Sequence, residues 1–216
     1  MAEIHFGCFA ALAMNPLINN AAQLRWRWGA EVPMTVRIPI GGKTRSGPYH
    51  ANMIESWFTN DPGLVIVFPS NPQDAYDLLI ESHNLPDPVI FLENKMLYDV
   101  TGEVPDQSYT LPFAEARVVK DGPDATIFAI GRMVQFAEDA SQLLADKGVN
   151  VSVIDLITTS PLDEDTILEF TEQTGRVVIV DESYPRCGFA ADVAAFISAE
   201  ALSLIHISEP TRLRRS

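Results

Sequence analysis

The sequence is poor in cysteine and in basic residues, and both shortages exclude some classes of function. Only two cysteines, Cys8 and Cys187, occur among 216 residues, and they lack the close spacing of metal ligands or of a disulfide framework. A reduced, cytoplasmic setting is therefore expected. Lysine and arginine together number 15 against 29 aspartates and glutamates, which gives a net charge of −14. Such a field repels polyanions, so neither nucleic acid nor an anionic membrane is an expected partner.

Long apolar runs are also missing. No segment approaches the roughly 18 consecutive apolar residues that a membrane-spanning helix needs. The first residues, Met1 to Phe6, have neither the basic start nor the sustained apolar stretch of a signal peptide. Yet 47% of the residues are hydrophobic, which is typical of a globular protein, and 216 residues are enough for one large or two small domains.

Segments of strand length alternate with segments of helical period along the chain. The predicted strands cover residues 31–38, 64–68, 88–92, 125–130, 151–156 and 176–181. The predicted helices cover residues 51–58, 72–83, 133–147, 163–174 and 189–201. Continuous apolar strands such as Leu64 to Phe68 are typical of parallel sheets that are buried on both faces. We therefore expect an α/β fold with two parallel-sheet domains, residues 1–95 and 113–201, joined by a proline-containing linker at 96–112.

Several helices carry clear local signals. Asn71 is the expected N-cap of one helix, with Pro72 at its first position and Asp74 completing a pattern like a capping box. The acidic run 163–165 favours the start of another helix through the helix dipole. One buried face is expected on the helix after Gly131, formed by Met133, Phe136, Ala137, Ala140, Leu143 and Leu144.

The loop from Gly41 to Asn52 carries the best candidate for chemistry. It follows a predicted strand, contains three glycines, and delivers His50 to the start of the next predicted helix. Ligands gather beyond the carboxyl ends of strands in open parallel sheets, and glycine lets the backbone approach a ligand closely. Position alone fits a catalytic His50 and a solvent-exposed one equally well. The helix that follows is expected to bury one face, formed by Ile54, Trp57 and Phe58.

The last segment, residues 202–216, differs abruptly from the rest. It carries three arginines against one glutamate, in a chain that is otherwise strongly acidic. Residues 202–212 resemble the translation of a sequencing-library adaptor, so we expect this tail to be non-native and the native C-terminus to be missing. A basic tail that recruits a partner is the alternative.

Short motifs follow one another in a fixed order along residues 2–201. They are Ala2 to Phe6 with Phe9, Asn20 to Arg25, Val32 to Arg37, Tyr49 to Asn52 with Glu55 to Phe58, Pro62 to Leu64, Pro69 to Pro72 with Asp74 and Ala75, and Pro88 to Asn94. No single motif is specific. Their order and spacing together resemble the beta subunits of the thiamine-diphosphate-dependent 2-oxoacid dehydrogenases, a group that includes pyruvate, branched-chain 2-oxoacid and acetoin dehydrogenases.

The resemblance implies roles for the two domains and for two residues. It implies a pyrimidine-binding domain for thiamine diphosphate, followed by a domain similar to the transketolase C-terminal domain. It places His50 beside the thiazolium, in proton transfer and in orienting a lipoyl group, a task that suits imidazole near neutral pH. It places Phe9 against the aminopyrimidine, where a flat side chain stacks. His50 is followed here by Ala51 and Asn52 rather than the family's usual Ser-Gln, so the local hydrogen bonding is expected to differ.

Part of the family's site lies outside this sequence. The glutamate that activates the cofactor belongs, in the family, to a segment upstream of Glu3, so the resemblance implies truncation at the N-terminus as well. The family's alpha subunit holds the diphosphate and its Mg²⁺, and we expect no metal ligands here. The paired acids Asp181 and Glu182 look like an acid/base pair, but a turn and an interface contact are the preferred interpretation.

The predicted function follows from the same resemblance. With an alpha subunit, in an α2β2 heterotetramer, the chain would oxidatively decarboxylate a 2-oxoacid, of the pyruvate or acetoin type, and pass the acyl group to a lipoylated acyltransferase. The truncated chain alone is expected to be inactive. Two alternatives remain, namely a transketolase-like homodimeric enzyme and a non-catalytic α/β assembly subunit.

Overall fold

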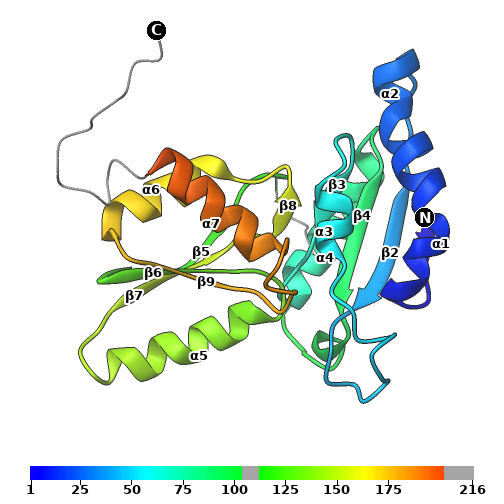
Figure 1. Ribbon diagram of the computed structural model, residues 1–216. Coiled ribbons are helices and arrows are strands. Elements are labelled where there is room, and N and C mark those ends of the chain that lie inside the picture. Colours follow the sequence, from blue (N-terminus) through cyan, green and yellow to red (C-terminus); the bar gives the residue numbers. More distant parts are fainter. Residues whose placement is uncertain (104–111, 202–216) are drawn as a thin grey trace, which may run out of the picture.

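Two sheets with flanking helices lie side by side in the computed structural model (Figure 1). The structure describes residues 1–103 and 112–201. Residues 104–111 of the predicted linker at 96–112, and the whole of the predicted non-native tail at 202–216, lie outside the described residues. Within the described ranges, no helix is long and apolar enough to cross a membrane.

The first sheet has the strand order β1-β2-β4-β3-β8. Its first four strands run parallel: β1 (Ala2–Glu3), β2 (Thr35–Ile40), β4 (Val89–Asn94) and β3 (Val65–Val67). The central strands are buried on both faces, as continuous apolar runs predict, since neither Ile66 and Ile90 on one face nor Val67 and Val89 on the other have exposed surface.

Strand β2 runs two residues further than the sequence predicts, through Pro39 to Ile40. Proline has no N–H and normally interrupts a sheet. Here β1 pairs only with Val36 and Arg37, so Pro39 has no neighbouring strand on that side. The strand can therefore continue and brings Ile40 to the carboxyl edge of the sheet.

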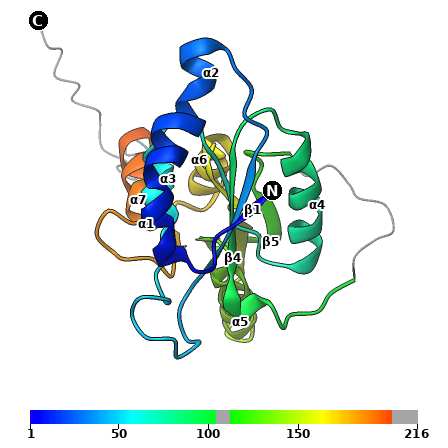
Figure 2. The same cartoon turned by 90° about the vertical axis from the view of Figure 1, so that its right-hand side faces the viewer.

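Helical segments cover both faces of this sheet (Figure 2). On one face lies a nearly continuous run of η1 (Gly7–Phe9), α1 (Ala10–Met14), the π-helical η2 (Asn15–Ala21) and α2 (Ala22–Trp28), together with α3 (Glu55–Thr59). On the other face lies α4 (Pro72–Asn84). Alternate strand residues fill the two layers, because Ile38 and Ile90 pack with Phe58, whereas Val89 and Phe91 belong to a separate cluster with Leu78 of α4.

The second sheet has the order β5-β7-β6-β9. The strands are β5 (Arg117–Pro123), β6 (Ala125–Ala129), β7 (Val151–Asp155) and β9 (Val177–Val180), and the helices are α5 (Met133–Ala145), α6 (Glu164–Thr174) and α7 (Phe189–Glu200). Three strands are parallel, but the edge strand β5 is antiparallel to β7. The predicted strands and helices of this domain are confirmed, while β5 was not predicted.

Two predicted helical faces are partly wrong. Helix α3 begins only at Glu55, and Trp57 is 39% exposed although Ile54 and Phe58 are buried. Helix α5 instead buries Val134, Ala137 and Ser141. The predicted face members Phe136 and Leu143 are 42% and 64% exposed. Because α5 packs along one narrow stripe, Phe136 faces outward, where Lys43 and Arg132 cover its ring.

The predicted helix caps are present. The Asp74 N–H donates to Asn71 Oδ1 at 2.9 Å, as an N-cap requires. The second half of the capping box differs, because the Asp74 carboxylate accepts from the Asn71 side chain at 2.6 Å. Asp163 caps α6 by accepting from the N–H of Thr166, and Gly175 ends it with a φ of 62°.

The two halves of the chain are joined by more than the linker. Strand β8 (Thr158–Ser160), which follows β7 in sequence, pairs antiparallel with β3 at the edge of the first sheet. Nearby, Arg117 Nη2 lies 2.9 Å from Asp155 of its own sheet and 3.2 Å from Asp74 of α4. Ser70 donates to the same Asp155 carboxylate at 2.5 Å. This network fixes how the loop after β3 lies against the second sheet.

Candidate functional site

His50 lies over the carboxyl end of the first sheet. It sits in a turn five residues before α3, so the expectation that it opens a helix is wrong. Its backbone carbonyl accepts a hydrogen bond from Nζ of Lys95, the first residue after β4. The N–H of Gly41, just after β2, donates to the carbonyl of Asn52 at 3.3 Å. The ends of two neighbouring strands thus hold the loop in place.

Three residues around η1 surround the imidazole of His50. The Phe6 ring stacks on it, with centroids 4.3 Å apart and planes 20° from parallel. The Phe9 ring lies 5.7 Å away at 53°. Cys8 Sγ lies 3.3 Å from Nδ1 of the imidazole, within hydrogen-bonding distance for sulfur. The structure therefore brings together the two residues singled out by sequence, Phe9 and His50, with Phe6 and Cys8 added.

Phe9 presents an open aromatic surface beside His50. It is 43% exposed, so a large part of its ring is open to solvent. Gly7 makes this placement possible, because a Cβ there would lie 3.1 Å from Ile40 and 3.3 Å from Ile54. Because Gly7 has no side chain, η1 can pack closely against the end of the sheet. The resulting flat apolar surface next to an imidazole fits a planar heterocycle.

Lys95 adds a cation to this cluster. Its ammonium lies 5.2 Å from the centroid of the Phe6 ring, close enough for a cation–π interaction. Burial lowers the pKa of Lys95. Sequence reasoning missed Lys95, although its place directly after the predicted strand at 88–92 is the same signal that drew attention to the loop carrying His50.

The loop after β9, in the second domain, contacts the loop that carries His50 and the end of β4. Asp181 accepts from the N–H groups of Ser183 and Ala190, at 3.0 and 3.3 Å, and burial raises its pKa. Glu182 accepts from the side chain of Asn94 at 2.8 Å. Tyr184 donates to Asn52 at 3.1 Å. Asp181 thus forms the predicted turn and Glu182 contacts the first domain, while the choice between this interpretation and an acid/base pair stays a prediction.

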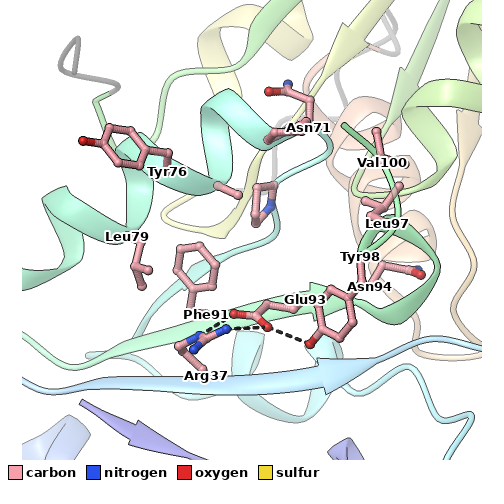
Figure 3. A pocket seen from close by; sticks show the side chains of 13 residues that line it. Arg37, Asn71, Tyr76, Leu79, Phe91, Glu93, Asn94, Leu97, Tyr98 and Val100 are labelled. Atoms are coloured by element: carbon pink, nitrogen blue, oxygen red, sulfur yellow. Dashed lines mark hydrogen bonds and ion pairs between the residues drawn. The ribbon is translucent and has the colours of Figure 1, made fainter. Parts of the chain in front are cut away.

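A separate pocket of about 350 Å³ lies between α4 and the segment after β4 (Figure 3). Its lining is mostly apolar: Pro69, Pro72, Ala75, Tyr76, Leu79, Phe91, Leu97 and Val100, with Asn71 and Asn94. At one end Arg37 donates to Glu93 at 2.5 and 3.1 Å, and Tyr98 donates to the same carboxylate at 2.7 Å. Burial and this hydrogen bond raise the pKa of Tyr98, so its phenol stays protonated. Neither Phe9 nor His50 lines this pocket.

The described residues offer no metal centre. Within residues 1–103 and 112–201, no three histidine, cysteine, aspartate or glutamate side chains are grouped so that they could hold a metal ion. The groups around His50 are an imidazole that can transfer a proton and the ring of Phe9, which can stack on a flat group.

Two family profiles match the chain in the order that the fold suggests. Residues 1–101 match "Transketolase, pyrimidine binding domain", and residues 114–208 match "Transketolase, C-terminal domain". A solved chain, "Split gene transketolase, inactive beta4 tetramer", shares the fold with a TM-score of 0.77 at 21% sequence identity, over 92% of this chain and 62% of that one. The expected α/β fold of two such domains is confirmed.

Curated relatives carry the comparison further. "Acetoin:2,6-dichlorophenolindophenol oxidoreductase subunit beta" of Cupriavidus necator is 42% identical over 95% of this chain and 61% of its own length. "Pyruvate dehydrogenase E1 component subunit beta" of Acholeplasma laidlawii is 40% identical over 93% and 62%. "2-oxoisovalerate dehydrogenase subunit beta" of Bacillus subtilis is 39% identical over 94% and 63%. The chain thus spans about three fifths of the length of these relatives.

Proposed function

Because the chain belongs to the family in which a transketolase pyrimidine-binding domain is followed by a transketolase C-terminal domain, we propose that it is part of a 2-oxoacid dehydrogenase beta subunit that uses thiamine diphosphate. Relatives named for acetoin, pyruvate and 2-oxoisovalerate all support this class of enzyme. The proposed substrate is a 2-oxoacid of the pyruvate type, or acetoin. The observation that carries the proposal is the half-exposed Phe9 ring beside His50 at the carboxyl edge of the first sheet.

Phe9 and His50 have different proposed tasks. The face of Phe9 would stack on the aminopyrimidine ring, and His50 would exchange a proton with the bound ligand and orient the lipoyl acceptor. Thiamine diphosphate, when bound, supplies the carbanion chemistry that decarboxylation needs. The residues here bind, orient and transfer protons. Since Nδ1 of His50 faces Cys8, the nitrogen left for the ligand is Nε2.

Assembly with other subunits is part of the proposal. An alpha subunit would hold the diphosphate and Mg²⁺ in an α2β2 heterotetramer, and a lipoylated acyltransferase would accept the acyl group, in the cytoplasm. Large apolar side chains support an interface along α1 and α2, because Leu12, Trp26 and Trp28 are 87%, 90% and 66% exposed. Exposed apolar groups of this size usually mark a surface that a partner covers.

The test is acylation of a lipoyl domain by the beta subunit assembled with its alpha subunit. His50→Ala is expected to slow acylation by about 10²- to 10⁴-fold, the usual contribution of a general acid or base. Phe9→Ala is expected to weaken binding of thiamine diphosphate by about 2- to 12-fold, which corresponds to the worth of one aromatic contact.

His83→Ala is the matched control. His83 is an exposed histidine whose Nδ1 contacts the carbonyl of Leu79 within α4, so its loss should leave acylation unchanged. If His50→Ala lowers the rate of acylation no more than His83→Ala does, the proposed role of His50 is contradicted.

A further inference from the structure

The imidazole of His50 is held on one edge by a thiol. Cys8 Sγ lies 3.3 Å from Nδ1, although the two residues are 42 positions apart in sequence. Within residues 1–103 and 112–201, no other group is hydrogen-bonded to a ring nitrogen of His50. We propose that Cys8 is a positioning residue, whose thiol holds Nδ1 so that Nε2 faces the ligand.

The surroundings of the ring support this role. Phe6 stacks on the face of the imidazole at 4.3 Å, which restricts tilting but permits rotation in the ring plane. A contact at Nδ1 restricts that rotation. Lys95 secures the backbone by donating to the His50 carbonyl. Cys8 therefore supplies a polar contact on the ring edge, which the contacts of Phe6, Phe9 and Lys95 do not provide.

The thiol also selects the tautomer of the neutral ring. A thiol is a weak donor, and a neutral imidazole has one nitrogen that accepts and one that donates. If the thiol hydrogen points at Nδ1, the ring hydrogen sits on Nε2. The consequence for catalysis rests on the proposed function of His50, because Nε2–H would be the group that gives its proton to the bound ligand.

Two cysteines in the chain give a matched pair of variants. Cys187 is exposed and lies at the start of α7 beside a separate cavity. In the assembled enzyme, Cys8→Ala is expected to lower kcat about 3- to 10-fold with little change in KM, as loss of one modest hydrogen bond predicts. Cys8→Ser keeps a hydroxyl donor and should restore kcat to within about twofold of the parent. Cys187→Ala should leave kcat unchanged.

A second readout needs no catalysis. In the full chain with ¹⁵N-labelled histidine, long-range ¹H–¹⁵N spectra report which ring nitrogen carries hydrogen, and His50→Gln identifies the His50 signals among four histidines. Nδ1 of the neutral ring should carry no hydrogen. Its resonance should move in Cys8→Ala and stay in place in Cys187→Ala.

The outcomes separate this proposal from the proposed function. If the parent assembly is inactive on 2-oxoacids and acetoin, the proposed function fails, and the spectra still decide the role of the thiol. A hydrogen on Nδ1, or an Nδ1 resonance that ignores Cys8→Ala, overturns the proposal. So does an active assembly in which Cys8→Ala leaves kcat unchanged, or in which Cys8→Ser loses as much as Cys8→Ala.

Discussion

Replacing Arg117 by methionine is expected to destabilise the protein by about 3 kcal/mol near pH 7.5. Arg117 lies within 3.2 Å of two carboxylates, those of Asp74 and Asp155, whose side chains are completely buried. Methionine keeps most of the apolar stem but removes the charge. Removing one partner of a buried ion pair costs about 3–5 kcal/mol. The lower end applies here, because the Arg117 side chain is 35% exposed and water screens it.

The loss of stability caused by Arg117→Met should be smaller at pH 5 than at pH 7.5. Burial raises the pKa of Asp155 from 3.8 to about 6, and Arg117 acts against this rise. A folded-state pKa above the unfolded one means that the contribution of Asp155 to stability is complete below about pH 4 and is lost as pH rises through about 6. The difference between these two pKa values of Asp155, 3.8 and about 6, corresponds to about 3 kcal/mol of stability. Without Arg117 the pKa rises further, so at pH 5 the carboxyl is protonated and the variant is penalised less.

Urea unfolding followed by tryptophan fluorescence at pH 5 and pH 7.5 measures both effects. The matched control is Arg25→Met, because Arg25 pairs with Asp87 on the surface and the two side chains are 43% and 34% exposed. A surface pair of this kind contributes about 1 kcal/mol or less. The reasoning is refuted if Arg117→Met costs no more than Arg25→Met at pH 7.5, or if its cost is the same at both pH values.

Three further substitutions test the backbone and the core. In thermal unfolding, Gly63→Ala is expected to cost about 2 kcal/mol or more, because Gly63 has a φ of +98° and a methyl group there would overlap the carbonyl of Ala22. Gly29→Ala, at a φ of +66° with open space, should cost about 1 kcal/mol in the same measurement. Glu55→Gln should make stability less dependent on pH between 5 and 8. Burial raises the pKa of Glu55, so its stabilising contribution is present at low pH and is lost as pH rises, and glutamine does not titrate. Equal melting temperatures for the two glycine variants, or an unchanged pH profile for Glu55→Gln, would contradict these expectations.

The apolar strands could be predicted from sequence, including the edge strand β9, whereas the edge strands β1, β5 and β8 could not. Strands β3, β4, β6, β7 and β9 are short apolar runs bounded by turn residues, and this pattern has one main interpretation. Strand β5 contains Lys120, Asp121 and Gly122, and its ladder with β7 has register shifts. An edge strand with polar residues lacks the regular apolar pattern of a strand, because only one of its two edges pairs with a neighbouring strand.

The candidate site was predictable only in part, for a related reason. His50 follows a strand and a glycine-rich loop, and that position can be read from sequence. Phe6, Cys8 and Lys95 meet His50 only because η1 and the end of β4 approach the same loop. Such contacts join residues more than 40 positions apart, and a single sequence contains no record of them. The bridge between Arg117 and Asp74 was missed for the same reason.

Strand β8 has a consequence for how the protein can be divided. It comes from the second half of the chain but completes the first sheet beside β3. A gene fragment that stopped before residue 112 would leave the edge of β3 unpaired, with Ile66 and Val67 beside it. Open apolar edges recruit strands from other molecules. The first domain is therefore a poor unit for separate expression or for transfer into a fusion protein, and a sound boundary must keep residues 158–160 attached.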